Sequence, residues 1–241
     1  MHFKKIKFIV FLIALLPLQL LAQIYAGKIV YERKTNIYKR FADIDIKDWV
    51  PDKDKIRTET FNLYFNPQKS YFEYQESDLK DPLSWTTTQS FAYVNSNSKE
   101  IIKIKNISGD KLIMKDSLRN WNWKITDSKR NIAGYSCRKA FCKPDDSTTI
   151  YAWYCLEVIP SIGPEIFQGL PGAILGLATE DGGIVFFAKS ITAMKVEDEL
   201  LNPNKLKGTV YEPEALRKKL DKQFGDYNWG KRMVKNIFAY L

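Results

Sequence analysis

Short runs in which apolar and polar residues alternate occupy most of the chain. Phe61, Leu63 and Phe65 alternate with polar Asn62 and Asn66, a period of two that places one face of a β-strand in a core. Polar turns separate many such runs, and this spacing predicts a mainly β fold: an antiparallel sheet forming a curved open barrel or a sandwich. Strands are expected at 28–34, 61–65, 70–74, 91–94, 101–107, 111–115, 121–126, 135–142, 150–158, 173–179 and 184–191.

The pattern changes to a helical spacing after about residue 203. Pro213 suits the first turn of a helix, and Gly225 is expected to end it. Apolar residues recur every three or four positions, and basic residues cover the other faces. One or two helices docked on the sheet are therefore expected, the alternative being a basic amphipathic segment on a membrane surface or in a partner groove. The apolar positions are Leu216, Leu220, Phe224, Tyr227, Trp229, Met233 and Ile237.

The first 22 residues have the pattern of a cleavable export signal. Lys4, Lys5 and Lys7 precede an apolar run at 8–16, and cleavage is expected after Ala22. The run is shorter than the ~20 residues that span a bilayer, which disfavours the alternative of an uncleaved anchor. We therefore expect a signal peptide at 1–22, a β-rich domain at 23–200 and a helical extension at 201–241, in the periplasm or at the outer-membrane periphery.

The net charge of the whole chain is +9, and loss of the three signal lysines leaves +6. A modest basic excess favours a solvated surface, with anionic lipid or an acidic partner as the alternative. Nothing in the pattern is typical of a nucleic-acid module. The acidic stretch at 43–55 lacks the glycine of a calcium loop and alternates with lysines, which favours a solvated loop over a metal site.

Export removes the only histidine, His2, from the mature chain. The commonest general base and the commonest metal ligand are then missing, which excludes a Ser-His-Asp triad and histidine-based zinc sites. The sequence also lacks a glycine-rich phosphate loop. Paired carboxylates remain as candidate chemistry, with Glu157, Glu165 and Glu180 along the later strands, but exposed strand positions are the simpler interpretation. We expect no cofactor, no metal and no catalytic site.

Three cysteines, Cys137, Cys142 and Cys155, would meet an oxidising compartment after export. If 135–142 and 150–158 form a hairpin whose facing residue numbers add to 292, Cys137 lies opposite Cys155 within reach of a disulfide, and Cys142 faces the other way. A register adding to 290 places Trp153 opposite Cys137 instead. A bulge that joins Cys142 to Cys155 and a soft-metal site of three thiols are the remaining alternatives.

The segment Gly163-Pro164-Glu165-Ile166-Phe167-Gln168-Gly169-Leu170-Pro171-Gly172 contains a demanding local signal. Pro171 presets φ, and Gly172 can adopt the positive φ of a type II turn. The apolar run at 173–178 then reads as a buried strand. A rigid apolar loop that leads into a core strand is expected.

These residues, together with Trp121-Asn122-Trp123, Ile132-Ala133-Gly134-Tyr135 and Ala152-Trp153-Tyr154, resemble the GLPGLI family of exported Bacteroidota proteins. The likeness spans roughly 25–195, although Ala173 stands where the family name has leucine. The resemblance implies a β-rich envelope protein, often encoded near TonB-dependent outer-membrane receptors, and carries no catalytic residues.

Three functions are compatible with these observations. The first is an accessory or binding protein of unknown ligand that acts with such a receptor. The second is a carrier of lipid or another apolar ligand, and the third is a carboxylate-dependent hydrolase. For the first, the expected binding residues are Trp153, Tyr154, Phe167, Gly169, Leu170, Pro171 and Gly172, since aromatics in a rigid frame give contact area at low entropic cost. Core packing is the alternative role of the same residues.

Overall fold

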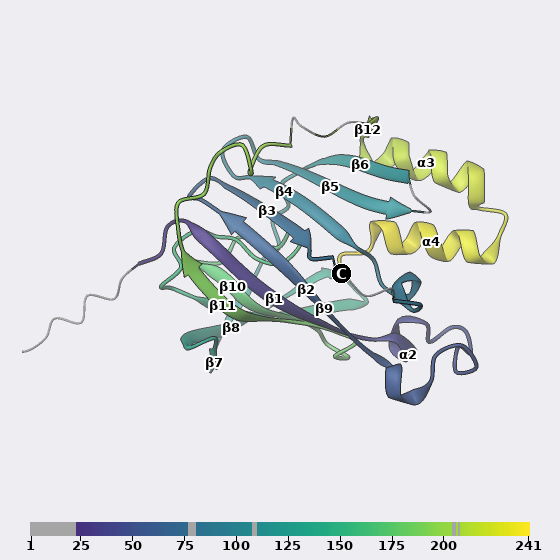
Figure 1. Ribbon diagram of the computed structural model, residues 1–241, viewed down its shortest axis with the longest axis horizontal. Helices are drawn as coiled ribbons and strands as arrows, with labels where there is room; N and C mark the ends of the chain where they lie inside the picture. The colour runs from purple at the N-terminus through teal and green to yellow at the C-terminus, as the bar shows by residue number, and fades with distance from the viewer. Residues whose placement is uncertain (1–22, 77–80, 108–109, 204–205, 207) are drawn as a thin grey trace, which may run out of the picture.

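The computed structural model describes residues 23–76, 81–107, 110–203, 206 and 208–241, and the expected signal peptide at 1–22 lies outside them. The described chain folds into one twelve-stranded sheet followed by two helices (Figure 1), which confirms the mainly β prediction. The strands are β1 (Gly27–Asn36), β2 (Ile56–Phe65), β3 (Lys69–Tyr74), β4 (Ser90–Asn95), β5 (Glu100–Ile107), β6 (Asp110–Ser117), β7 (Lys124–Ile132), β8 (Tyr135–Asp145), β9 (Thr148–Cys155), β10 (Ala173–Thr179), β11 (Ile184–Ala193) and β12 (Val210–Tyr211). The helical elements are α2 (Ile37–Arg40), η1 (Asp52–Asp54), η2 (Ser84–Thr86), α3 (Pro213–Phe224) and α4 (Asn228–Phe238).

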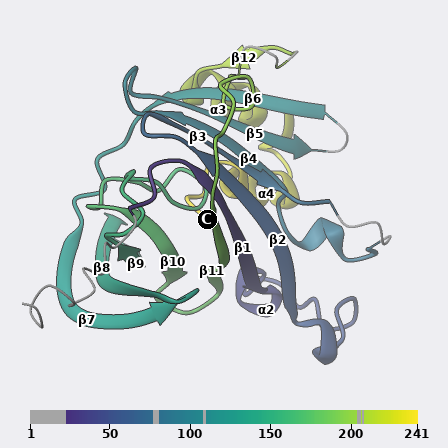
Figure 2. The same ribbon diagram turned by 60° about the vertical axis from the view of Figure 1, so that its left-hand side comes forward.

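The sheet order is β12-β6-β5-β4-β3-β2-β1-β11-β10-β9-β8-β7. Strand β1 therefore joins two antiparallel meanders, because it pairs with β2 on one side and with β11 on the other. The short β12 adds to β6 in parallel. The sheet curls strongly, so that β7 to β10 turn back toward the middle of the molecule (Figure 2), and it stays open between its edge strands β12 and β7.

Alternation gives most strands one inner face, which lies on the side of the C-terminal helices and of the segment between β9 and β10, whereas β7 is largely exposed and β10 is buried on both faces. On β1, Ile29 and Tyr31 are fully buried, as are Phe61 and Leu63 on β2. Burial of each such side chain contributes roughly 1.5–3 kcal/mol, so this face supplies most of the stability. The apolar period of two at 61–65 marks these core positions correctly.

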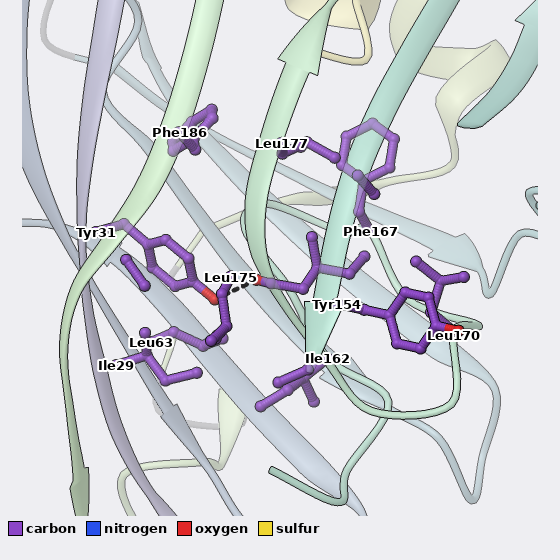
Figure 3. Packing of buried hydrophobic residues seen from close by; sticks show 14 of the residues in the cluster. Ile29, Tyr31, Leu63, Tyr154, Ile162, Phe167, Leu170, Leu175, Leu177 and Phe186 are labelled. Atoms are coloured by element: carbon purple, nitrogen blue, oxygen red, sulfur yellow. Dashed lines mark hydrogen bonds between the residues drawn. The ribbon is translucent and has the colours of Figure 1, made fainter. Parts of the chain in front are cut away.

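The segment 156–172 fills the hollow of the curled sheet. Its side chains Ile162, Phe167 and Leu170 are buried against the inner face, as Figure 3 shows. From β1, the Tyr31 hydroxyl donates a 2.7 Å hydrogen bond to the Ile174 carbonyl at the start of β10. This long-range bond ties the end of the segment to the centre of the sheet.

The Leu-Pro-Gly turn differs in detail from the expected type II turn. Gly172 does adopt a positive φ of 137°, and a Cβ there would collide with the carbonyl of Cys155. The turn is closed, however, by the Gly172 amide donating to the Leu170 carbonyl at 2.8 Å, which is a three-residue turn. The Ala173 amide donates instead to the Val158 carbonyl at 2.9 Å, which lies beyond the end of β9.

Helices α3 and α4 dock on β6 through the stripe predicted from the sequence. Leu216, Leu220, Val234 and Ile237 are buried in one cluster with Met114 of the sheet. The predicted stripe is therefore covered only in part, because Tyr227 and Trp229 are each 55% exposed, while Val234, which was not predicted, is buried. Within the described residues, every helix is too short or too polar to cross a membrane.

Several predicted strands have different bounds, since β2 begins five residues earlier than expected and β7 and β8 end later. Trp121, expected in a strand, precedes β7, and its ring stacks on Phe167 with centroids 4.2 Å apart. Core packing against the 156–172 segment therefore outweighs its strand propensity. Strand β9 ends at Cys155 rather than residue 158, where the chain leaves the ladder to enter that segment.

The predicted hairpin register is confirmed, but the predicted disulfide is wrong. Cys137 faces Cys155 across β8 and β9, yet all three cysteines are free and buried. Facing positions are insufficient, because a disulfide also needs both sulfurs turned toward each other at about 2.05 Å. The Cys137 thiol instead lies 3.5 Å from the Tyr135 carbonyl on its own strand.

Candidate functional site

A group of buried polar side chains interrupts the apolar inner face at one end. Arg33 of β1 lies directly opposite Glu59 of β2, and Nη2 and Oε2 are 2.7 Å apart with both side chains almost fully buried. The guanidinium carbon lies 4.6 Å from the centre of the Phe61 ring. Thr87 donates to the second Glu59 oxygen at 2.7 Å, so this buried ion pair has its hydrogen bonds met.

Two lysines on β5 share the same face. Lys103 lies opposite Met114 and Lys105 opposite Leu112, and both partners contact the C-terminal helices. Directly opposite residues of a pair point to the same side, so both lysines face inward. Each is only 7% exposed.

The 156–172 segment contributes a carboxylate to this group. Glu165 is buried at a positive φ of 58°, a backbone conformation that costs a non-glycine residue about 1–3 kcal/mol. The Ser90 hydroxyl of β4 donates a hydrogen bond to its Oε1 atom. Ser90 in turn lies directly opposite Lys105, so the carboxylate is one side chain away from the lysine pair.

The two lysines differ from the buried arginine because, among the described residues, no hydrogen-bond acceptor or ion-pair partner contacts either ammonium group. Burial lowers the pKa of Lys105 to about 8, Glu165 opposes that shift, and the positive charges of Lys103, Arg33 and Arg40 add to it. Burial likewise lowers the pKa of Lys103. A buried ammonium without a partner is a costly arrangement that points to a functional role.

Lys105, unlike Lys103, lines a cavity of about 510 Å³ at the end of the sheet. Its polar wall includes Arg40, which donates to the Thr88 hydroxyl at 2.9 Å, and the pKa of Arg40 is lowered to about 10 by burial and then by the charge of Arg33. The opposite wall is largely apolar. It comprises Phe41, Trp85, Trp229, Met233 and Ile237.

The two tryptophans lie at the solvent side of this cavity, since Trp85 is 52% and Trp229 is 55% exposed. Trp85 contacts the Phe41 ring edge-on at 5.7 Å, and α4 is tied to the same region by a 2.8 Å ion pair between Arg232 and Asp43. The cavity is therefore lined by aromatic side chains near solvent (Trp85 and Trp229) and by cationic side chains in its buried part (Arg40 and Lys105), which we call its floor.

With every group ionised, the four cations Arg33, Arg40, Lys103 and Lys105 exceed the two carboxylates Glu59 and Glu165, which leaves a local charge of +2. Of these groups only Arg40 and Lys105 line the cavity, and the positive charge there attracts anions and repels metal ions. Within the described residues, no group of three or more His, Cys, Asp or Glu side chains is arranged to hold a metal.

The structure disperses the binding residues expected from the sequence. Tyr154 is buried in the core, whereas Trp153 points to the outer face, where Arg130 lies 5.2 Å from its ring centre. Strand alternation requires this separation. Phe167, Leu170 and Gly172 lie in the core of the 156–172 segment, and only Gly169 and Pro171 are exposed.

Of the three candidate carboxylates, only Glu165 joins the polar group. Glu180 is exposed and accepts a 3.3 Å hydrogen bond from Tyr151, and Glu157 lies half-buried beyond β9. Glu59, Lys105 and Arg40 were not foreseen. A signal exists for Glu59, because it stands two residues before Phe61 on the same face of β2.

Comparisons with known proteins support a fold more than a function. A family model described as a protein of unknown function (Porph_ging) matches residues 143–176, which include the Leu-Pro-Gly turn and Glu165. No curated protein matches the chain.

Two crystal forms of PNGF-II resemble the chain with TM-scores of 0.54 and 0.55 at 20% and 19% identity, over 80% and 81% of its length. The chain spans about a third, 32%, of those structures. An uncharacterized conserved protein from Thermus thermophilus scores 0.41 at 6% identity, over 77% of this chain and 90% of that one. The likeness to PNGF-II shows a shared fold alone.

Proposed function

We propose that the chain is a binding protein that holds a small organic anion in the cavity between β5, the 84–89 segment and α4. The observation that carries this proposal is Lys105, a buried ammonium that lines the cavity without a partner among the described residues. An anionic ligand supplies the missing partner. Hydrogen bonds to charged groups contribute about 1.5–3 kcal/mol each, so loss of this contact weakens binding at least tenfold.

The rest of the ligand is apolar or aromatic, because the opposite wall offers it such a surface. Trp85 and Trp229 flank the opening, and Met233 adds a side chain that adapts to irregular shapes. Aromatic contacts contribute about 0.5–1.5 kcal/mol beyond the area they bury. Arg40 stands beside Lys105 as a second donor to the anion.

The alternative of a lipid carrier needs a large apolar hollow inside the sheet. The 156–172 segment occupies that region with Ile162, Phe167 and Leu170, which favours the cavity at the end of the sheet instead. The hydrolase alternative needs two available carboxylates. Glu59 is held by Arg33 and Thr87, and Glu165 by Ser90, which favours a binding role.

The proposed place of action follows from the sequence alone. A signal peptide at 1–22 and the GLPGLI resemblance support an exported protein of the periplasm or the outer-membrane periphery, working beside a TonB-dependent receptor. Fractionation with N-terminal sequencing tests this, with a mature chain starting at Gln23 expected. A full-length chain retained in the cytoplasm contradicts it.

Binding is tested with the fluorescent probe 8-anilinonaphthalene-1-sulfonate, an aromatic anion of suitable size. We expect saturable one-site binding that weakens at least tenfold in Lys105→Met and several-fold in Trp229→Ala. The matched controls are Lys111→Met, an exposed lysine of the neighbouring strand, and Trp49→Ala, a 66% exposed tryptophan outside the cavity. Equal affinity of Lys105→Met and Lys111→Met refutes the proposal.

A further inference from the structure

We propose that Lys105 bonds covalently and reversibly to its ligand, forming an imine with the carbonyl group of an anionic aldehyde or ketone. This inference rests on the proposed function, since it names the chemical class of the ligand bound in the same cavity. It assigns two tasks to the floor of the cavity. Arg40 holds the anionic group, and Lys105 meets the carbonyl carbon.

The geometry singles out one lysine. Among the described residues that line the cavity, Lys105 is the one primary amine, whereas Lys103, two positions along the same inward face, does not line it. No described acceptor holds the Lys105 nitrogen, so nothing must be broken before it reacts. Lys105 itself is only 7% exposed, and a buried position of this kind favours an imine over its hydrolysis.

Imine formation needs the neutral amine, and the surroundings of Lys105 supply it. With a pKa of about 8, about a fifth of Lys105 is neutral at pH 7.4, against about a thousandth of an exposed lysine of pKa ~10.4. The selectivity expected from protonation alone is therefore about 200-fold. Glu165 favours the charged form, while Lys103, Arg33 and Arg40 disfavour it. From α4, Arg232 also lines the cavity but is paired with Asp43.

The reaction balances without an oxidant or a reductant. The nitrogen lone pair attacks the carbonyl carbon and forms a C–N bond, and the amine proton moves to the carbonyl oxygen to give a carbinolamine. The hydroxyl group then leaves with the remaining N–H proton as water, the C–O bond breaks, and the nitrogen lone pair forms the C=N bond. Ser90 lies directly opposite Lys105 and donates a hydrogen bond to Glu165, which makes this carboxylate the candidate group for accepting and returning the proton.

The test uses pyridoxal 5′-phosphate as the probe, because it combines an aromatic body, an aldehyde and a phosphate. Protein and an equimolar amount of probe are mixed at pH 7.4 and reduced with borohydride, and the adduct is located by peptide mass spectrometry. We expect one dominant adduct on Lys105, with Lys103 unmodified. Pyridoxal, which lacks the phosphate, is expected to give at least tenfold less adduct.

Two variants separate the covalent step from binding. Lys105→Arg keeps the charge but cannot form the imine, so it is expected to retain anilinonaphthalene sulfonate binding and to lose the dominant adduct. Lys111→Met serves as the control and keeps both. This inference is overturned if the adducts are spread over exposed lysines or if Lys105 carries none. In that case the proposed function still stands, provided that binding of anilinonaphthalene sulfonate depends on Lys105. If neither the Lys105 adduct nor Lys105-dependent binding is found, the imine and the proposed function are both overturned. Circular dichroism confirms that each variant is folded.

Discussion

Ser90 on β4 lies directly opposite Lys105 on β5, and its hydroxyl hydrogen-bonds Glu165 from the 156–172 segment rather than the lysine. The strained segment that carries the Leu-Pro-Gly turn is thereby coupled to the floor of the cavity. This contact connects the recognisable motif of the sequence with the buried amine that is proposed to bind ligand.

Glu165→Gln removes the negative charge that favours the ammonium form of Lys105. The pKa of Lys105 should then fall further below its ordinary range, because burial and the neighbouring cations act unopposed. The pH dependence of adduct formation with pyridoxal 5′-phosphate measures this shift, since its midpoint moves to lower pH. An unchanged midpoint contradicts the coupling, and Glu180→Gln, an exposed carboxylate on another edge, is the control.

Breaking the buried Arg33–Glu59 pair should be costly. Glu59→Gln leaves the guanidinium without its charge partner, and removal of one member of such a pair costs about 3–5 kcal/mol. Denaturant unfolding of the single variants Arg33→Met and Glu59→Leu and of the double variant Arg33→Met/Glu59→Leu measures the coupling. The double variant is expected to be more stable than either single one.

The exposed pair Lys218–Glu214 provides the comparison for that cycle, because both of its side chains are at least 76% exposed. Lys218→Met should change the free energy of unfolding by less than about 1 kcal/mol. A similar loss at both pairs would show that burial does not govern the strength of the inner one.

Gly172 should tolerate no side chain. Its φ of 137° is unfavourable for alanine, and a Cβ would overlap the Cys155 carbonyl. Gly134 offers a matched control with a φ of 87° but open space around the new Cβ. We expect Gly134→Ala to cost about 1–2 kcal/mol and Gly172→Ala clearly more, as measured by chemical unfolding. Equal costs would mean that the backbone at 172 relaxes.

The thiols should be inert in the folded protein. Burial raises the pKa of Cys137 and of Cys142 to about 12 and that of Cys155 to about 11, so little thiolate exists at pH 8. Ellman's reagent should react slowly with native protein and titrate three thiols per chain after unfolding. Fewer than three in unfolded protein would contradict the free cysteines of the structure.

Local patterns predicted the strands and helices well. The alternation at 61–65 and the helical spacing that begins at Leu216 each indicate which face of the element is buried, and this depends on neighbouring residues alone. The hairpin register that sets Cys137 opposite Cys155 also followed from local counting. Trp121 was misassigned because its environment is the distant Phe167.

The candidate site could not be derived in this way. Arg40, Lys105 and Trp229 come from α2, β5 and α4, and only the sheet order and the helix docking bring them to one cavity. On β5, Lys103 and Lys105 alternate with Ile102 and Ile104, so the pattern alone favours the isoleucines, rather than the lysines, as the inward-facing residues. The predicted binding residues Trp153 and Tyr154 do not share a site, because adjacent residues of a strand face opposite sides of the sheet.

Lys105 should also govern part of the pH dependence of stability. Its pKa is about 8 when folded and about 10.4 when unfolded, so between those values the unfolded chain binds more protons. Its contribution to the free energy of unfolding is therefore most unfavourable below pH 8 and improves as pH rises toward ~10.4, by on the order of 3 kcal/mol. Subtracting the profile of Lys105→Met isolates this rise from other titrations. A flat difference contradicts the buried charge.

The most direct test of the central claim compares stability and binding in Lys105→Met at pH 7. Because methionine fills a similar volume without a buried charge, the variant should unfold at equal or higher denaturant concentration than the wild type while its affinity for anilinonaphthalene sulfonate falls at least tenfold. A variant that loses stability and still binds the probe with unchanged affinity would show that Lys105 supports the fold rather than the ligand.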